Sequence, residues 1–127
     1  MKKSYQRDII LKVVMDSYDH PTAETIYSRV RSIIPNISLG TVYRNLNVLA
    51  DSGYIKRIGL SNNQDRFDKT ITPHHHIRCI MCNSVTDIFS DSAEEFYDKI
   101  ESETKYKIVL KDLVFEGICP NCIEKGK

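Results

Sequence analysis

The chain has 127 residues, of which 41% are hydrophobic and 28% charged, with five glycines, four prolines and no tryptophan. This length suits one ordinary domain or two small ones, and the composition is typical of a soluble globular protein. No apolar run approaches the roughly 18 to 20 residues that a membrane-spanning helix needs. The N-terminal stretch is interrupted by Arg7, Asp8 and Lys12 and lacks the apolar core of a secretion signal. We therefore expect a cytoplasmic protein with no membrane partner.

The formal net charge of +1 is unevenly distributed along the chain. Residues 1–70 carry 11 Lys and Arg against 7 Asp and Glu, whereas residues 71–127 carry 7 against 10. The front half, with a net charge of +4, is therefore the better candidate for contact with nucleic acid. An excess this small also arises by chance.

The spacing of apolar residues predicts three helices in the first half of the chain. The first covers residues 5–18 and ends at His20-Pro21. The second begins after Thr22, which can cap it, and ends before Pro35; the third begins after Ser38 and ends at Gly53. The residues expected to be buried are Ile9, Ile10, Val13 and Val14, then Ala23, Ile26, Tyr27, Val30 and Ile34, then Val42, Leu46 and Leu49.

A two-stranded hairpin is predicted to follow the third helix. Its strands are YIKRIGL (54–60) and DRFD (65–68), joined by the turn SNNQ (61–64). Three short helices followed by such a hairpin predict a winged helix-turn-helix, in which the third helix enters the major groove and the hairpin lies along the DNA backbone. We therefore assign residues 1–70 to a winged-helix DNA-binding domain.

The outward face of the third helix carries the candidate readers of DNA bases, which are Thr41, Tyr43, Arg44 and Asn47. Arginine can pair with a guanine edge and asparagine with adenine, and a ring can contact the thymine methyl group. The expected phosphate contacts, which add salt-dependent affinity but little sequence information, are Arg7, Lys56 and Arg57. A solvated helix face is the alternative explanation for Arg44 and Asn47.

The second half of the chain predicts a small α/β unit, so that the whole chain belongs to the α+β class. Segments HHHIRCIM (74–81) and SVTDIF (84–89) are strand-like, and YKIVLKDLVFEGI (106–118) supplies one or two further strands. Between them, SDSAEEFYDKIESET (90–104) predicts an amphipathic helix with Phe96, Tyr97 and Ile100 turned inward. Such a unit buries little core, so a metal or a partner chain would supply the missing stability. We assign residues 71–127 to a metal-binding dimerisation domain.

All four cysteines occur in two pairs of the same spacing, Cys79-x-x-Cys82 and Cys119-x-x-Cys122. In a chain without an export signal the reducing cytosol disfavours disulfides, and paired units of this kind suit tetrahedral zinc. We predict one zinc site made by all four thiolates. Two disulfides or four unused thiols are the alternatives.

Three consecutive histidines, residues 74–76, lie just before the first cysteine pair. Side chains in a strand alternate between its faces. His74 and His76 are therefore expected on one face, with His75 and Cys79 on the other, which favours two separate metal sites.

Two histidines need further ligands, and the candidates are His20, Asp68 and Asp87. A set built only from nitrogen and oxygen suits iron(II), manganese(II) or zinc. Each candidate also has an ordinary structural explanation, as a helix-start residue, a turn cap and a surface carboxylate.

Five motifs occur in the order found in the Fur family of metal-dependent transcriptional repressors: HPTAETIY, ISLGTVYRNLNVLADSGYIKRI, RFD, HHHIRCIMCNSVTDI and GICPNC. The resemblance runs from about residue 4 to residue 123, and within the family the chain most resembles the peroxide-sensing PerR type. It implies a homodimer that binds double-stranded operator DNA, with structural zinc at Cys79, Cys82, Cys119 and Cys122. It further implies regulatory iron(II) or manganese(II) at His20, Asp68, His74, His76 and Asp87. Hydrogen peroxide would then be sensed by iron-catalysed oxidation of His20 or His74.

Individual positions favour different subtypes within the family. Asp87 stands where iron sensors that resemble Fur usually carry Glu, and Ile118 stands where they often carry His. No fifth cysteine is present to supply the thiolate that zinc sensors tend to add. Arg44, in contrast, is typical of Fur-type DNA readers, so a ferric uptake regulator that senses iron without ligand oxidation is the alternative. The chain begins just before Tyr5, and we expect it to lack the leading helix of many family members.

Two other classes of protein fit parts of the pattern. Three histidines and two aspartates also suit a metal hydrolase or oxygenase, but the sequence offers no candidate substrate pocket, so we predict a protein that is not an enzyme. It would have no small-molecule ligand beyond the metal and the peroxide signal. A zinc-ribbon adaptor for protein partners would depend on Cys79 but not on His74 or Asp87.

Overall fold

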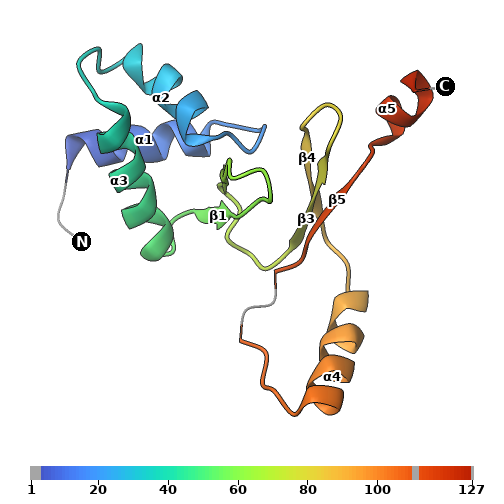
Figure 1. The fold of residues 1–127 in the computed structure, drawn as a ribbon. Helices are drawn as coiled ribbons and strands as arrows, with labels where there is room; N and C mark the ends of the chain where they lie inside the picture. The colour runs from blue at the N-terminus through green and yellow to red at the C-terminus, as the bar shows by residue number, and fades with distance from the viewer. Residues whose placement is uncertain (1–3, 110–111, 127) are drawn as a thin grey trace. The chain divides into compact units, whose positions relative to one another are not determined.

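The computed structural model describes residues 4–109 and 112–126, which form two compact units that divide between Ile71 and Thr72 (Figure 1). The first unit contains α1 (Tyr5–Met15), α2 (Ala23–Arg31), α3 (Leu39–Asp51), β1 (Lys56–Ile58) and β2 (Arg66–Asp68). The second contains β3 (His75–Cys79), β4 (Val85–Ile88), α4 (Ser92–Thr104), β5 (Val114–Gly117) and α5 (Pro120–Lys125). The expected α+β class is confirmed. In the part of the chain that is described, no helix is long and apolar enough to cross a membrane.

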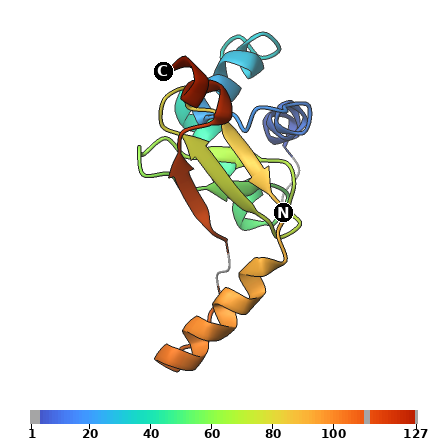
Figure 2. The same ribbon diagram turned by 90° about the vertical axis from the view of Figure 1, so that its right-hand side faces the viewer.

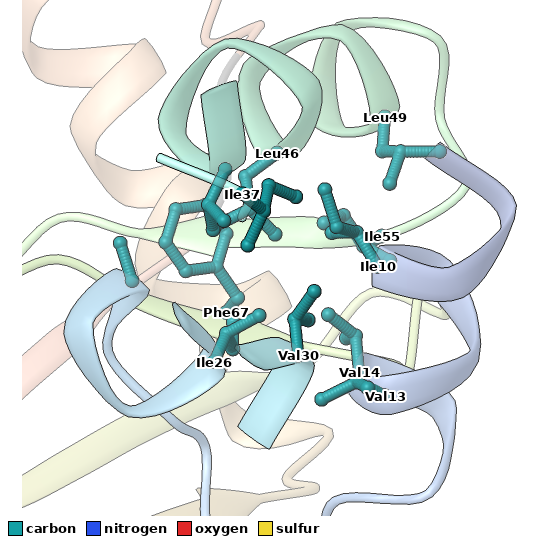
Figure 3. Close-up of a cluster of buried hydrophobic side chains, with 12 residues drawn as sticks. Ile10, Val13, Val14, Ile26, Val30, Ile37, Leu46, Leu49, Ile55 and Phe67 are labelled. Atoms are coloured by element: carbon teal, nitrogen blue, oxygen red, sulfur yellow. The ribbon is translucent and has the colours of Figure 1, made fainter. Parts of the chain in front are cut away.

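Three helices and an antiparallel hairpin make the first unit a winged helix-turn-helix, as predicted. In the hairpin Arg57 pairs with Phe67, and the two strands are shorter than the sequence suggests. The ring of Phe67 lies among the apolar side chains of the helices (Figure 3). The core contains Ile10, Val13, Val14, Ala23, Ile26, Val30, Val42, Leu46 and Leu49, all predicted, together with Ile37, Ile55 and Phe67. Ile9, Tyr27 and Ile34 are only partly buried.

The helices begin where the sequence predicts but two of them end earlier. The hydroxyls of Thr22 and Ser38 accept from backbone amides three residues on, as N-caps do. α1 stops at Met15 rather than residue 18, because Ser17 donates to the Val13 carbonyl and accepts a hydrogen bond from Arg29 of α2. α2 stops at Arg31, where a tight turn begins before the pre-proline residue.

α3 ends at Asp51, and Gly53, the predicted stop, lies just beyond it in a Schellman motif. The Tyr54 amide donates to the Leu49 carbonyl and the Gly53 amide to the Ala50 carbonyl, with Gly53 at φ 82°. This left-handed conformation disfavours residues that carry a Cβ.

The second unit is a three-stranded sheet with β3 in the centre, between antiparallel β4 and parallel β5 (Figure 2). β3, β4 and β5 are each shorter than the segments predicted, and residues 110 and 111 of the last segment lie outside the described residues. α4 forms as expected, but its inward face is different. Tyr97 is buried and Ile100 half-buried, whereas Phe96 is 51% exposed. The prediction for Phe96 was wrong because adjacent helical residues point about 100° apart, and the buried side of α4 is centred on Tyr97.

Replacing Gly53 by alanine should lower the free energy of unfolding by ~1–2 kcal/mol, the cost of a left-handed residue with a Cβ. No atom lies within 4 Å of the added methyl group, so the loss would come from the backbone. Gly59→Ala is the matched control, since its added methyl is also uncrowded and its φ lies outside the left-handed region. Chemical denaturation of both variants measures the difference, and equal stabilities would contradict this account.

Candidate metal centres and DNA interface

The second unit brings all four cysteines together. Cys79 ends β3, Cys82 follows in a tight turn, Cys119 caps α5 and Cys122 lies within it. The four Sγ atoms lie within 4.8 Å of one another, and none of the four cysteines is in a disulfide. Four converging thiols are the donor set of a structural zinc site.

Backbone amides support the thiolate form of Cys79. The amides of Cys82, Cys119 and Met81 each donate to its Sγ at 3.4 Å. These hydrogen bonds, with that from Cys82 the largest contribution, lower the pKa of Cys79 to about 6. The hydrogen bond with Cys119 raises the pKa of Cys122 to about 12, followed by burial and by its contacts with Cys79 and Cys82. A dication among the four sulfurs would remove this conflict, because all four could then be deprotonated.

A second cluster lies at the other end of β3. The register pairs His76 with Asp87 of β4, and Asp87 Oδ1 lies 3.0 Å from His74 Nε2 and 3.2 Å from His76 Nε2. His75 points elsewhere and accepts the backbone amide of Leu113 through Nδ1 at 3.0 Å. The alternation predicted for the three histidines is therefore confirmed.

The tautomer of His74 follows from its neighbours. Its Nδ1 lies 2.6 Å from the Thr72 carbonyl oxygen, which can only accept, so Nδ1 carries a proton. Nε2 then faces Asp87 Oδ1, where a cation between them would bind both groups. Metal-ligating histidines are usually held in this way through the other ring nitrogen. The ring of Phe89 stacks on this imidazole, with centroids 4.9 Å apart.

The first unit holds the remaining two candidates side by side. His20 Nε2 lies 3.4 Å from Asp68 Oδ2, while Asp68 Oδ1 accepts the Thr70 amide at 2.9 Å. His20 has φ 49° and stands directly before Pro21. A non-glycine residue in this region costs on the order of 1–3 kcal/mol and persists only where surrounding contacts hold it.

The candidate DNA-contacting residues are linked to one another within the first unit. Tyr43, Arg44 and Asn47 are exposed on α3, with Thr41 half-buried beside them. Tyr43 donates to Glu24 of α2 at 2.8 Å, and Arg44 donates to Thr41 at 3.0 Å.

Further contacts join the helices and the hairpin to this face. Arg57 of β1 donates to Asn47 at 2.8 Å and lies 3.7 Å from Asp51. Arg7 donates to Asn45 at 3.0 Å, and Lys56 is half-buried on β1. α3 and the hairpin thus present one connected surface.

Residues 1–116 match the Ferric uptake regulator family. The chain belongs to the Fur family. It is 31% identical over 121 residues to "Peroxide-responsive repressor PerR" of Staphylococcus epidermidis, a match that covers 95% of this chain and 81% of that protein. PerR of Staphylococcus aureus is 32% identical over 120 residues, covering 94% and 81%.

Solved structures of the family have the same fold as this Fur-family chain. The ferric uptake regulator Fur of Helicobacter pylori matches with a TM-score of 0.84 and 25% identity, over 97% of this chain and 83% of that one. The peroxide stress regulator of Campylobacter jejuni matches with a TM-score of 0.74 and 26% identity, over 92% and 88%. The chain is therefore a metal-responsive regulator of the Fur family.

Asn45 is a polar residue of this Fur-family protein that was not predicted from the sequence. It is buried on α3, donates to the Thr41 carbonyl and accepts from Arg7 of α1. Its position three residues after Val42 and four before Leu49 places it on the inward face. That spacing alone was enough to predict that Asn45 is buried.

The hydrogen bond to Glu24 is the main cause that raises the pKa of Tyr43, and burial of the phenol and the charge of Glu24 add to it. Glu24→Gln should therefore lower the pKa of Tyr43 toward its ordinary value of about 10, since it removes the negative charge facing the phenolate. The tyrosinate absorbance of each protein, less that of its Tyr43→Phe counterpart, measures this pKa. A pKa that stays raised in the Glu24→Gln protein would show that the carboxylate is not its cause.

Proposed function

We propose that this protein is a homodimeric DNA-binding repressor that senses hydrogen peroxide through oxidation of a histidine ligand. The observation that carries the proposal is the convergence of Asp87 with His74 and His76, which offers a cation nitrogen and oxygen but no sulfur. All four cysteines are already gathered in the other cluster. The similarity to proteins named peroxide-responsive repressors supports the same function.

The four cysteines would hold a structural zinc ion. Among the described residues of the second unit, Cys79 and Tyr97 are the only buried hydrophobic side chains. So little apolar burial leaves the sheet dependent on another source of stability, and structural zinc contributes directly to folding.

The regulatory ion, iron(II) or manganese(II), would be held by His20 and Asp68 of the first unit and by His74, His76 and Asp87 of the second. Ligands drawn from both units would couple metal binding to the arrangement of the DNA-binding unit. An ion that binds the DNA-competent arrangement more tightly shifts the equilibrium toward it.

Oxidation of a ligand histidine would be the step that senses hydrogen peroxide. Iron(II) held there would supply redox chemistry toward hydrogen peroxide that manganese(II) would not. In the net step one peroxide oxygen would be inserted at a ring C–H of His20 or His74 and the other would leave as water, so that peroxide is the oxidant and any electron lent by the metal is returned to it. The modified imidazole is a poorer donor, so the metal is lost and the operator is released.

DNA would be bound with α3 in the major groove and the hairpin along the backbone. Thr41, Tyr43, Arg44 and Asn47 would face base edges, while Arg7, Lys56 and Arg57 would meet phosphates. A dimer of such units reads two half-sites related by two-fold symmetry.

A Fur-type sensor of iron level is the second candidate. It is favoured by Arg44, which is exposed on α3 as a Fur-type DNA reader would have it, and by the structural similarity to Fur of Helicobacter pylori. The two functions share the metal ligands and differ in whether peroxide alters them.

Peptide mass spectrometry separates the two functions. Protein loaded anaerobically with iron(II) should gain one oxygen on His20 or His74 after a small dose of hydrogen peroxide, and should lose operator binding. Protein loaded with manganese(II) should do neither. His75 is an internal control, because it shares a strand with His76 but faces Leu113.

Unmodified histidines in iron-loaded protein of verified occupancy would rule out ligand oxidation. The Fur-type function would then be retained.

The two metal sites should respond to different substitutions. Cys79→Ser should abolish bound zinc and lower the thermal stability of the second unit, since it removes one thiolate of the set. Asp87→Asn should keep zinc at one equivalent and weaken manganese(II) binding. Native mass spectrometry counts both metals, and loss of zinc from the Asp87→Asn protein would argue against two separate sites.

A further inference from the structure

The backbone at His20 is held in an unfavourable conformation by contacts from β2. A residue before proline is ordinarily extended, yet His20 has φ 49°. In an extended chain successive carbonyls point to opposite sides. Here the carbonyls of Asp19 and His20 both accept hydrogen bonds from one guanidinium, that of Arg66.

Arg66 is well placed to impose this turn. Its Nε donates to the His20 carbonyl at 2.5 Å and its second terminal nitrogen donates to the Asp19 carbonyl at 3.4 Å. The residue is only 8% exposed. Its own backbone forms a bridge with Thr22, and the next amide, that of Phe67, donates to the Pro21 carbonyl at 2.9 Å. The side chain and backbone of β2 therefore bind four successive residues, 19–22.

The same strand carries the carboxylate that meets the imidazole. Residues two apart on a strand share a face, so Arg66 and Asp68 lie on one side of β2 while Phe67 enters the core on the other. Arg66 fixes the backbone of His20, and Asp68 Oδ2 lies 3.4 Å from its Nε2. One face of the three-residue strand β2 thus fixes the backbone of His20 and also places Asp68 beside its imidazole.

A second arginine supports the turn from the other side. Arg29 of α2 donates to both carboxylate oxygens of Asp19, at 3.2 and 2.7 Å, and to Ser17 at 2.8 Å. This pair is more exposed than Arg66 and acts on the residue before His20. Its contribution to the conformation of His20 is therefore indirect.

We infer that Arg66 is a positioning residue for regulatory metal binding, because it presets His20 beside Asp68 within the DNA-binding unit. This inference rests on the proposed function, in which His20 and Asp68 are ligands. Arg66 would act through the backbone of His20 rather than as a ligand itself. Residues that orient metal ligands in this way typically alter metal affinity by about 10- to 100-fold when replaced.

Arg66→Met, which keeps the bulk of the side chain and removes its donors, tests the inference. In zinc-loaded protein, manganese(II) affinity measured by electron paramagnetic resonance should fall about 10- to 100-fold, with zinc content unchanged. Arg66→Lys keeps one donor and should lose less. Arg31→Met is the matched control, since it removes an exposed guanidinium of α2 that lies over Tyr27, and it should bind manganese(II) as the unaltered protein does.

A double-mutant cycle with His20→Ala separates positioning from general stabilisation. If Arg66 acts through His20, adding Arg66→Met to His20→Ala should cause little further loss of manganese(II) affinity. Fully additive losses, or unchanged affinity in Arg66→Met, would overturn the inference. Unchanged affinity in His20→Ala would instead show that the proposed ligand set is wrong, so the two failures are distinguishable.

Discussion

The hydrogen bonds between β2 and residues 19–22 connect the parts of the first unit that matter for function. β2 is three residues long, yet it pairs with β1 on one edge and with the segment before α2 on the other. Its central residue, Phe67, fills the core between the helices. Displacing β2 would therefore disturb the hairpin, the core and the environment of His20 together. A strand this short can matter so much because its three residues do different things. Arg66 binds the backbone before α2, Phe67 fills the core, and Asp68 lies beside the imidazole of His20.

The second unit is organised by polar rather than apolar burial. His74, His75, His76 and Arg78 are all buried on or beside β3, and Arg78 is paired with Glu116 of β5 and hydrogen-bonded to Asn83. Buried polar groups are costly unless each finds a partner, so this sheet gains little from the hydrophobic effect. Two clusters of metal-binding side chains at opposite ends of β3 are consistent with a fold that depends on ions for its stability. The small apolar core predicted from the sequence has this physical basis.

The sequence could predict what depends on local pattern. Helical periodicity, the caps Thr22 and Ser38, the stop at Gly53 and the alternation along residues 74–79 all follow from neighbours within a few positions. The misses depend on distant contacts. α1 ends early because Ser17 bonds with Arg29, and Arg66 is buried because it reaches a carbonyl 46 residues earlier in the chain. Periodicity also shows that α4 has an apolar side, but not that the buried part of that side is centred on Tyr97, which is why Phe96 was misplaced.

If the ligands are divided between the two units as proposed, oxidation of one histidine would be enough for release. Under that proposal neither unit supplies all five ligands, so an ion that takes the whole set would favour one arrangement of the units. Reversing a two-state population from 99:1 to 1:99 requires a change of ~10⁴-fold in the relative affinity for the two states. An ion bound by one unit only has no such preference, however tightly it binds. Loss of an imidazole from either unit would therefore weaken the proposed coupling as a whole, and a preset His20 would let the ion bind without first ordering the turn before α2.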